Sequence, residues 1–590
     1  MRRMIRTSGG VGFTVVCALL WAAPGQAQPP SRPVSVVAGD DLVGLWGSET
    51  MLGPQVRGEV VLQRVGSAWS VRVGGFEMQG VPRGDSLTLT LPGGQGMLRA
   101  RLFTRRSAAA PSGASMEVTD PFWVQPAGDG GAAYAVPLRF VSAGRDTWRA
   151  TLVPLDARVP LYLQVTRGAD GALQGVFRNP AANWPGRAGA YGVVREGDQV
   201  TFLDPRTKKP RYRQPYDSAA GRITFDFGSP IVLTRRTSEQ AVGFFPRSPS
   251  LEPYAYRVPA DLGDGWRSAA APSVGVDAEA LQTMVRALVR VDPLNETLPR
   301  AHSLLVARRG ALVLDEYFHG TAADQLHDLR SASKTITSVM VGAAMQGGVR
   351  IGASTPVLDG AGAVPITVGH LLSHTSGLAC DDDDERSPGN EDAMQEQTTE
   401  PDWYRFTRAL PRLHRPGTTY AYCSGGINLV GQAIADATHS WIPAFFDRAV
   451  ARPLGITHYA MNLMPTGDAY AGGGLQLRPR DLLKFGQLYL DRGVWNGKRV
   501  VSAAWVATST ARQSSRADGS TDGYGWHRHV LRARGRDYET YEASGNGGQF
   551  VVVIPDLSLV VATTAGSYGH YGAWRRIREA LVTAVMATVR

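Results

Sequence analysis

A serine and a lysine three residues apart, at the start of an apolar helix, constrain this chain most. Ser331 and Lys334 lie in the stretch RSASKT, residues 330–335. Residues i and i+3 share one face of a helix, so the hydroxyl and the amine can meet in one pocket. A serine hydroxyl needs a neighbour to take its proton, and a desolvated lysine can be neutral enough to do so. The spacing therefore predicts a nucleophile beside its base.

The spacing alone is weak evidence, because chance gives roughly one S-x-x-K in a chain of this size. Two details strengthen it. Lysines are scarce in this arginine-rich chain, and no other lysine has a serine three residues before it. The helix that follows is also apolar, which favours the burial that the lysine chemistry needs. Its apolar positions are Ile336, Val339, Met340 and Ala343.

The first residues have the pattern of a secretory signal. Arg2, Arg3 and Arg6 precede an apolar run over residues 11–23, and small residues follow up to Ala27. We expect a signal peptide over residues 1–27 and export to a periplasm or outside the cell. A retained anchor is the alternative, but the run is too short to span a bilayer comfortably. After cleavage we expect no stable membrane insertion.

Removing this segment leaves two cysteines, Cys380 and Cys423. In an oxidising compartment they can form a disulfide, which we mark as a candidate bridge. The alternative is two unrelated buried thiols.

Residues 28–245 have all-β character. Short alternating runs such as residues 60–63, 69–73 and 86–91 are separated by glycine-rich turns. Stretches near residues 44–47 and 161–177 look loosely alike, which predicts a barrel or sandwich built of hairpins. No nucleophile and base pair up in this region, and its role is unknown from the sequence.

Residues 246–271 are rich in Pro, Gly and Ala, which predicts a linker. Residues 272–590 alternate between helical and strand patterns. Asp277 suits a helix N-cap, hairpins are expected over residues 304–314 and 550–562, and an amphipathic helix closes the chain near residues 574–585. These patterns predict an α+β fold for residues 272–590.

The formal net charge is +10, yet the arginines are scattered and form no basic face with interleaved aromatics. We therefore expect no nucleic-acid partner. The pattern favours a small-molecule or peptide substrate instead, without a metal or other cofactor, and leaves the oligomeric state unknown.

Four blocks in order resemble the serine β-lactamase and penicillin-binding-protein superfamily, in particular its class C-like branch of esterases, peptidases and amide hydrolases. They are the S-x-S-K of residues 331–334, LLSHTSGL at 371–378, PGTTYAYCS at 416–424, and GGGL at 472–475 with DLLKFG at 481–486. The resemblance covers roughly residues 272–590. It implies an antiparallel sheet flanked by helices plus a helical subdomain, preceded here by the all-β domain.

The resemblance also implies roles. Ser331 is the acylated nucleophile, Lys334 its base and Tyr422 the phenol that relays the proton. Ser424 stands where the family often has Asn, and is expected to bind Lys334 or the substrate. His374, although close to these blocks, is expected to be structural. We expect the acidic run of residues 381–385 to be a solvated loop beside the site, with a cation site as the alternative.

The third family motif departs from the lactamase pattern. The expected strand carries Ala543, Ser544 and Gly545 where lactamases and transpeptidases have K-T-G, with the register open by about one residue, so it lacks the lysine that meets a substrate carboxylate. Its glycines still allow backbone amides near Asn546 and at Ser331 to form an oxyanion hole.

Together these features predict an exported serine hydrolase that cleaves an ester or amide. A β-lactamase or D,D-peptidase acting on cell-wall-type substrates is the nearest alternative. A ligand-binding protein with a vestigial hydrolase domain is the alternative from another class.

Overall fold

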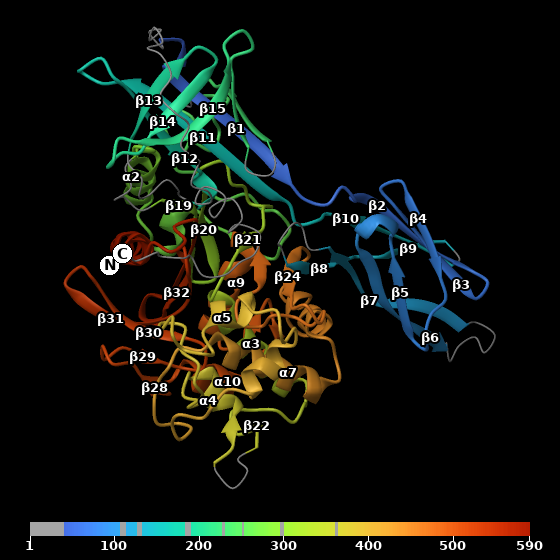
Figure 1. Cartoon of the computed structure of the whole chain (residues 1–590). Coiled ribbons are helices and arrows are strands. Elements are labelled where there is room, and N and C mark those ends of the chain that lie inside the picture. Colours follow the sequence, from blue (N-terminus) through green and yellow to red (C-terminus); the bar gives the residue numbers. More distant parts are fainter. Residues whose placement is uncertain are drawn as a thin grey trace.

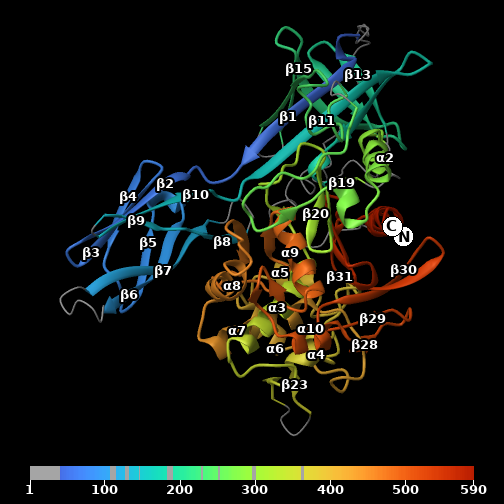
Figure 2. The ribbon, with the colours of Figure 1, turned by 180° about the vertical axis from the view of Figure 1, so that it is seen from behind.

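The computed structural model describes residues 40–106, 114–126, 132–144, 146–182, 190–226, 230–249, 253–294, 300–359 and 364–590. The predicted signal peptide and its cleavage site lie outside these residues. The described chain forms a barrel, a sandwich and a larger C-terminal domain (Figures 1 and 2). None of its helices is long and apolar enough to cross a membrane. The predicted fold class, a mixed α and β C-terminal domain after a strand-rich region, is confirmed.

The barrel closes through eight antiparallel strands around an aromatic core that includes Trp46, Phe177, Phe202 and Phe225. Strand β1 pairs along its whole length with β11, so the two similar-looking stretches of the sequence are neighbouring strands. In order around the barrel the strands are β1 (Gly44–Leu52), β11 (Ala157–Arg167), β12 (Leu173–Arg178), β13 (Tyr191–Glu196), β14 (Gln199–Leu203), β15 (Pro210–Asp217), β16 (Arg222–Asp226) and β17 (Pro230–Arg235).

The sandwich is inserted between β1 and β11. The sequence predicts a barrel or a sandwich for this part of the chain, and the structure contains both. Alternating residues such as Leu62, Val71, Leu89 and Leu98 bury one face of each sheet. One sheet holds β4 (Phe76–Gly80), β3 (Ala68–Val73), β2 (Gly58–Val65), β10 (Thr147–Leu152) and β9 (Val141–Gly144), in that order.

The second sheet of the sandwich continues into the C-terminal domain. Strand β8 of the insertion pairs antiparallel with β24, more than three hundred residues later in the chain. In order the strands are β21 (His327–Asp328), β25 (Leu475–Leu477), β24 (Tyr459–Leu463), β8 (Ala133–Pro137), β7 (Ala114–Gln125), β6 (Met97–Arg106) and β5 (Ser86–Thr90). Main-chain hydrogen bonds therefore join the two units as one sheet.

A nine-stranded sheet forms the core of the C-terminal domain. Successive residues of β32 face opposite sides: Val551 and Val553 contact one cluster, and Val552 and Ile554 the other. The predicted hairpins are confirmed as β19–β20 and β32–β33. In order the strands are β18 (Arg267–Ser268), β20 (Ala311–Tyr317), β19 (Ala301–Arg308), β33 (Leu559–Ala565), β32 (Gln549–Ile554), β31 (Arg536–Gly545), β30 (His527–Ala533), β29 (Thr521–Asp522) and β28 (Ser514–Ser515).

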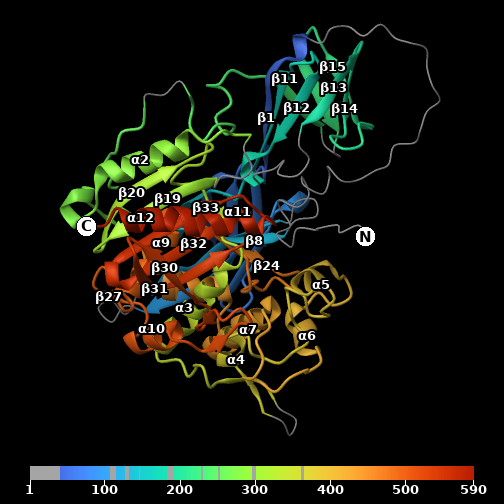
Figure 3. The same cartoon turned by 90° about the vertical axis from the view of Figure 1, so that its left-hand side faces the viewer.

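Helices cover both faces of this sheet. On one face lies α2 (Ala278–Val289), whose predicted N-cap is confirmed because Asp277 accepts bonds from two helical amides. The last residues of the chain lie beside the start of α2, where Val276 pairs with Val589. They follow three helical segments on this face: α11 (Tyr571–Arg576), a π-helical segment (Ile577–Val582) and α12 (Thr583–Ala587) (Figure 3). On the other face, α9 (Pro479–Leu490) packs so closely at Gly486 that a side chain there would overlap Val551 and Val560.

Helix α3 (Ala332–Gln346) runs between the sheet and a helical subdomain, and its first thirteen residues are buried. The apolar positions expected from the sequence are among them. The remaining helices and short strands of this side are β22 (Pro356–Leu358), β23 (Ile366–Thr367), α4 (Val368–Leu372), α5 (Glu391–Glu396), α6 (Trp403–Arg408), α7 (Ser424–Thr438), α8 (Ile442–Phe446), β26 (Val494–Trp495), β27 (Lys498–Arg499) and α10 (Ala503–Thr510).

The segment expected to be a linker packs on the C-terminal domain. Trp266 enters the main core, and β18 extends the nine-stranded sheet. Asp264 accepts two hydrogen bonds, of 2.6 and 2.9 Å, from the buried guanidinium of Arg480, which also donates to Asp315 at 2.8 Å. Burial of this cation is offset by the two carboxylates, and Arg480 in turn lowers the pKa of Asp264.

Arg480 provides a test of this packing. Replacing it by Met leaves Asp264 and Asp315 as buried carboxylates without their shared cation, so we expect the free energy of unfolding to fall by about 3 kcal/mol or more. Chemical denaturation measures the change. Arg536→Met, at an exposed pair with Asp556, is the control and should cost about 0.5 kcal/mol or less. Equal effects of the two substitutions would contradict the structural account.

Candidate active site

The pocket of the C-terminal domain opens at the N-terminus of α3, where Ser331 immediately precedes the helix. Its volume is about 180 Å³. The backbone changes direction sharply just before the serine, because Arg330 has a φ of +49°, which residues other than glycine seldom adopt. Asp328 accepts the Arg330 amide at 2.9 Å and pairs with its guanidinium. These contacts hold the turn that presents the serine.

Ser331, Lys334 and Tyr422 come together as the sequence predicts. Lys334 Nζ donates to Ser331 Oγ over 3.0 Å and lies 4.9 Å from the centre of the Tyr422 ring. The phenol of Tyr422 is hydrogen-bonded to both of the other side chains. Residues one helical turn apart supply the serine and the lysine, and the tyrosine lies two residues before α7. Ser331 is therefore in contact with both members of a lysine–tyrosine pair.

The pKa of Lys334 differs from the sequence-based expectation, which is a lysine made neutral by desolvation. Burial alone would lower its pKa, but the Tyr422 phenol and the Glu391 and Asp382 carboxylates together raise it above the ordinary value. At rest the lysine is thus an ammonium that donates to the serine. Burial also raises the pKa of Tyr422, although Lys334 and Ser331 oppose this. Loss of one proton from the lysine–tyrosine pair creates the form able to accept the serine proton.

Asp382 is the most consequential residue that sequence reasoning missed. It belongs to the acidic run expected to be solvated, yet it is partly buried in the pocket wall, while Asp383, which also lines the pocket, and Glu385 are exposed. Burial and the neighbouring Glu391 raise the pKa of Asp382 to about 7, against the opposing effects of Lys334 and Ser424. The expectation of a uniformly solvated loop is therefore wrong at this position. Among the described residues, no three His, Cys, Asp or Glu side chains gather as a metal site.

Ser424 does not serve the role expected of it. Its side chain is fully buried, and its amide and hydroxyl donate to Asp382 Oδ2 over 2.8 and 2.7 Å. It does not line the pocket. The amide of Glu391 donates to the other oxygen of Asp382 at 2.9 Å. Ser424 thus orients a carboxylate beside Lys334.

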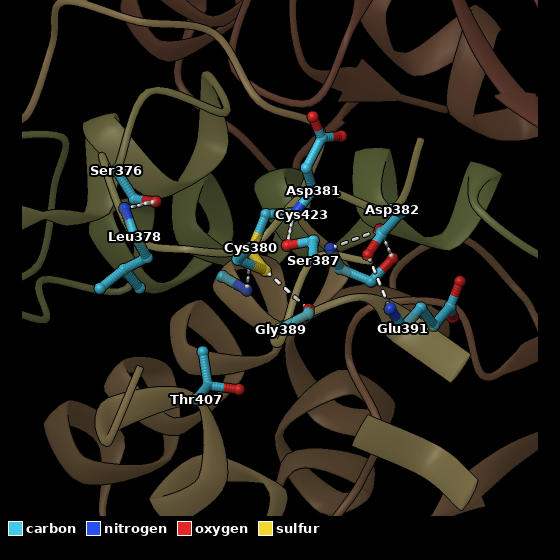
Figure 4. The surroundings of a disulfide bond; sticks show 12 residues. Ser376, Leu378, Cys380, Asp381, Asp382, Ser387, Gly389, Glu391, Thr407 and Cys423 are labelled. Atoms are coloured by element: carbon cyan, nitrogen blue, oxygen red, sulfur yellow. Dashed lines mark hydrogen bonds between the residues drawn. A yellow bond between two sulfur atoms is a disulfide. The ribbon is translucent and has the colours of Figure 1, made fainter. Parts of the chain in front are cut away.

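A disulfide links Cys380 to Cys423 (Figure 4). It joins the loop that carries Asp382 to the residue that follows Tyr422. The Asp382 amide also donates to the Tyr422 carbonyl over 2.7 Å, so the two segments are tied twice. The disulfide and this hydrogen bond therefore fix the loop that carries Asp382 against the segment that carries Tyr422.

His374 lies behind the site and plays a structural part, as expected. Its Nδ1 accepts the Cys423 amide at 3.2 Å, and its ring lies 4.5 Å from that of Tyr422. Complete burial lowers the pKa of His374 to about 3, so the ring is neutral at physiological pH. A neutral ring that accepts a backbone amide supports the tyrosine and takes no part in a Ser-His-Asp triad.

Strand β31 forms the opposite wall of the pocket, with Ser544, Gly545 and Asn546 among the lining residues. A side chain at Gly545 would overlap the Leu329 carbonyl oxygen, and its Cβ would lie 3.1 Å from the Ala332 amide nitrogen. Glycine is therefore required for the strand to approach the start of α3. This approach brings β31 main chain beside the Ser331 amide, where an oxyanion hole is expected. The side-chain oxygen of Asn546 accepts the Gly569 amide and helps to shape the loop.

No lysine lines the pocket from β31, in agreement with the departure seen in the third motif. Two arginines of the pocket wall are paired with carboxylates: Arg330 with Asp328, and Arg516 with Asp522 at 2.9 Å. A third, Arg575, lies exposed on α11 at the edge. Positive charge close to Ser331 is therefore largely neutralised.

Comparison with known proteins agrees with this geometry. Residues 300–582 match the family model described as beta-lactamase. A 6-aminohexanoate-dimer hydrolase of Paenarthrobacter ureafaciens is 29% identical over 275 residues, which cover 42% of this chain and 68% of the relative. Penicillin-binding protein 4 of Amycolatopsis lactamdurans is 28% identical over 250 residues, covering 35% of this chain and 61% of the relative.

Among solved structures, one described as a putative beta-lactamase from Bacteroides dorei is similar over 53% of this chain and 99% of its own. Its sequence identity is 17% and its TM-score 0.42. The family match spans all of the blocks on which the resemblance rests, from the S-x-S-K helix to strand β31. Residues 300–582 of this chain therefore match the family model described as beta-lactamase and form a beta-lactamase-like domain.

Proposed function

We propose that the protein is an exported serine hydrolase that cleaves an ester or amide through an acyl-enzyme on Ser331. The observation that carries the proposal is the contact of Ser331 Oγ with Lys334 Nζ, beside the phenol of Tyr422 and a glycine-bearing strand. In the form of the lysine–tyrosine pair that has lost one proton to solvent, Ser331 attacks the substrate carbonyl and its proton passes to the pair. The same pair returns the proton to the leaving group, and water then releases the acyl product.

Export is part of the proposal. It is supported by the signal-like first residues and by the disulfide between Cys380 and Cys423, since such bridges persist in oxidising compartments.

An ester or linear amide is favoured over a β-lactam. A β-lactam or a peptide C-terminus carries a carboxylate that gains most from an unpaired cation near the nucleophile. In this pocket Arg330 and Arg516 are paired, and β31 offers only Ser544 and Gly545. The name of the relative from Paenarthrobacter ureafaciens, a hydrolase of an amide dimer, is compatible with this preference.

The first test is covalent labelling of the nucleophile. A fluorophosphonate probe should label the wild-type protein on Ser331, because the hydroxyl is activated by Lys334 and Tyr422. Ser331→Ala should lose labelling by at least about a hundredfold. The exposed Ser515→Ala is the matched control and should label like the wild type. Equal labelling of Ser331→Ala, followed by peptide mass spectrometry, would refute the proposed nucleophile.

A second test separates the substrate classes. We expect kcat/KM for a short-chain p-nitrophenyl ester to exceed that for a chromogenic cephalosporin by about tenfold or more, because Arg330 and Arg516 are already paired with carboxylates and the exposed Arg575 lies only at the pocket edge. Steady-state spectrophotometry measures both, with Ser331→Ala as the background. Faster cephalosporin turnover would favour the β-lactamase alternative.

The third test concerns Asp382 and pH. Its pKa is raised to about 7 in the folded protein, so folding favours its protonated form. This costs stability as the pH rises from about 4 to about 7, because the unfolded chain ionises first. Asp382→Asn removes the cost. The melting temperature of the variant minus that of the wild type should therefore increase between about pH 5 and about pH 8.

The difference between the two proteins cancels the titration of groups that they share. Asp383→Asn, at the exposed neighbouring position, controls for the loss of one negative charge from the loop. A difference for Asp382→Asn that stays constant over this pH range would show that the carboxyl is ionised throughout it.

A further inference from the structure

Strand β8 of the inserted sandwich places Tyr134 in the wall of the active-site pocket. Tyr134 pairs across the sheet with Asn462 of β24, and both residues line the cavity that contains Ser331. The tyrosine thus comes from a unit outside residues 300–582, the part of the chain that matches the beta-lactamase family. The pocket in this protein is completed by the insertion.

Four polar side chains form a continuous row across neighbouring strands, which we name the polar strip: Tyr134, Asn462, Gln476 and Asp328. In the sheet, Gln476 is opposite both Ala460 of β24 and Asp328 of β21. Since alternate residues of a strand share a face, Asn462 lies on the same face as Gln476. All four line the pocket, and Gln476 hydrogen-bonds to the Tyr134 hydroxyl.

One atom of the polar strip lacks a partner. Asn462 is 8% exposed, and its side-chain oxygen accepts no hydrogen bond from the described residues. A buried polar atom of this kind costs free energy unless a donor reaches it. Gln476 is hydrogen-bonded to the Tyr134 hydroxyl, whereas the buried Asn462 oxygen has no donor among the described residues, and a substrate group that packs against the strip could supply one.

The strip is held rigidly across the junction of the two units. Arg139, which follows β8, donates to both oxygens of the buried Asp447 over 2.9 and 2.6 Å. Phe122 of β7 packs edge to face against Trp441, with ring centres 5.2 Å apart. With the main-chain pairing of β8 and β24, these contacts fix the position of Tyr134 before any substrate arrives. A preformed site loses little entropy on binding.

We propose that the polar strip is a specificity subsite, completed by Tyr134 of the inserted sandwich, that selects substrates with an amide or hydroxyl group placed to donate a hydrogen bond to Asn462. The inference rests on the proposed acyl-enzyme chemistry of Ser331 and adds no chemical step to it. Tyr134 holds the orientation of the strip and closes its outer side. The inserted domain thus takes part in the choice of substrate.

The test compares pairs of p-nitrophenyl esters that differ only in one amide. The N-acetylglycinate and the isocaproate have the same shape, but only the first has an amide N–H in its acyl part. A second pair carries the amide, or its hydrocarbon isostere, in the leaving alcohol. The measured quantity is the ratio of kcat/KM within each pair.

In at least one pair we expect the wild type to prefer the amide by roughly fivefold to tenfold, the effect of about one hydrogen bond. Asn462→Leu and Tyr134→Ala should reduce this ratio to about one, while Tyr134→Phe should retain part of it because the ring remains. Phe103→Ala, an exposed aromatic on β6 of the same sheet, is the control and should keep the wild-type ratio.

Labelling of Ser331 by a small ethyl fluorophosphonate separates this inference from the proposed function. Such a probe is too short to need the strip, so the wild type and the Phe103→Ala control should label within about twofold of each other, and labelling of Asn462→Leu or Tyr134→Ala shows that Ser331 of that variant can still be acylated. Wild type that does not label refutes the proposed hydrolase. Wild type that labels but shows no amide preference, or variants that label and keep the full preference, overturn the specificity subsite.

Discussion

The buried ammonium of Lys334 is the interaction on which the rest of the site depends. Taking a charged amine out of water is costly, and here the cost is offset by Asp382 and Glu391 and by the phenol of Tyr422. The structure around it keeps these partners in place. Ser424 fixes one oxygen of Asp382, and the disulfide fixes the Asp382 loop against the tyrosine.

This arrangement explains why so many polar side chains tolerate burial near the start of α3. Asp382 and Glu391 are like charges that repel each other, and the proton that Asp382 retains up to about pH 7 relieves the repulsion. The lysine raises the stability of the ionised carboxylates, and they raise its pKa in return. The catalytic set is therefore a coupled group whose members cannot be replaced singly without changing the others.

The position of the turn before Ser331 also depends on the sheet that the sandwich and the C-terminal domain share. Because β8 pairs with β24, the sandwich, β25 and β21 form one hydrogen-bonded layer that ends two residues before Arg330. The amide of Leu475 on β25 also donates to Ser333 Oγ at 3.2 Å, within the first turn of α3. Hydrogen bonds within this layer therefore link the inserted domain to the turn at Arg330 that precedes Ser331. Continuous main-chain pairing leaves little freedom for the two units to move independently.

The sequence by itself indicated that Ser331, Lys334 and Tyr422 belong to one site, because a local spacing of i and i+3 and short contiguous motifs single them out. It also determined the α+β class and the main hairpins, since alternation and helical periodicity are local patterns. It did not indicate that Asp382 is partly buried or that Ser424 donates to it, because burial and partners are set by chain segments far apart. A carboxylate in an acidic run looks solvated until a disulfide and α7 enclose it.

The polar strip was equally out of reach of the sequence. Tyr134 stands in a strand of a separate unit, with no motif around it, and only the pairing of β8 with β24 brings it to Ser331. The closed barrel and the inserted sandwich share the same alternating pattern, so their division also depends on which strands pair. Periodicity in the sequence indicates which face of a strand is buried. Only the tertiary structure decides which strand or helix covers that face, because pairing partners are chosen by packing across the whole chain.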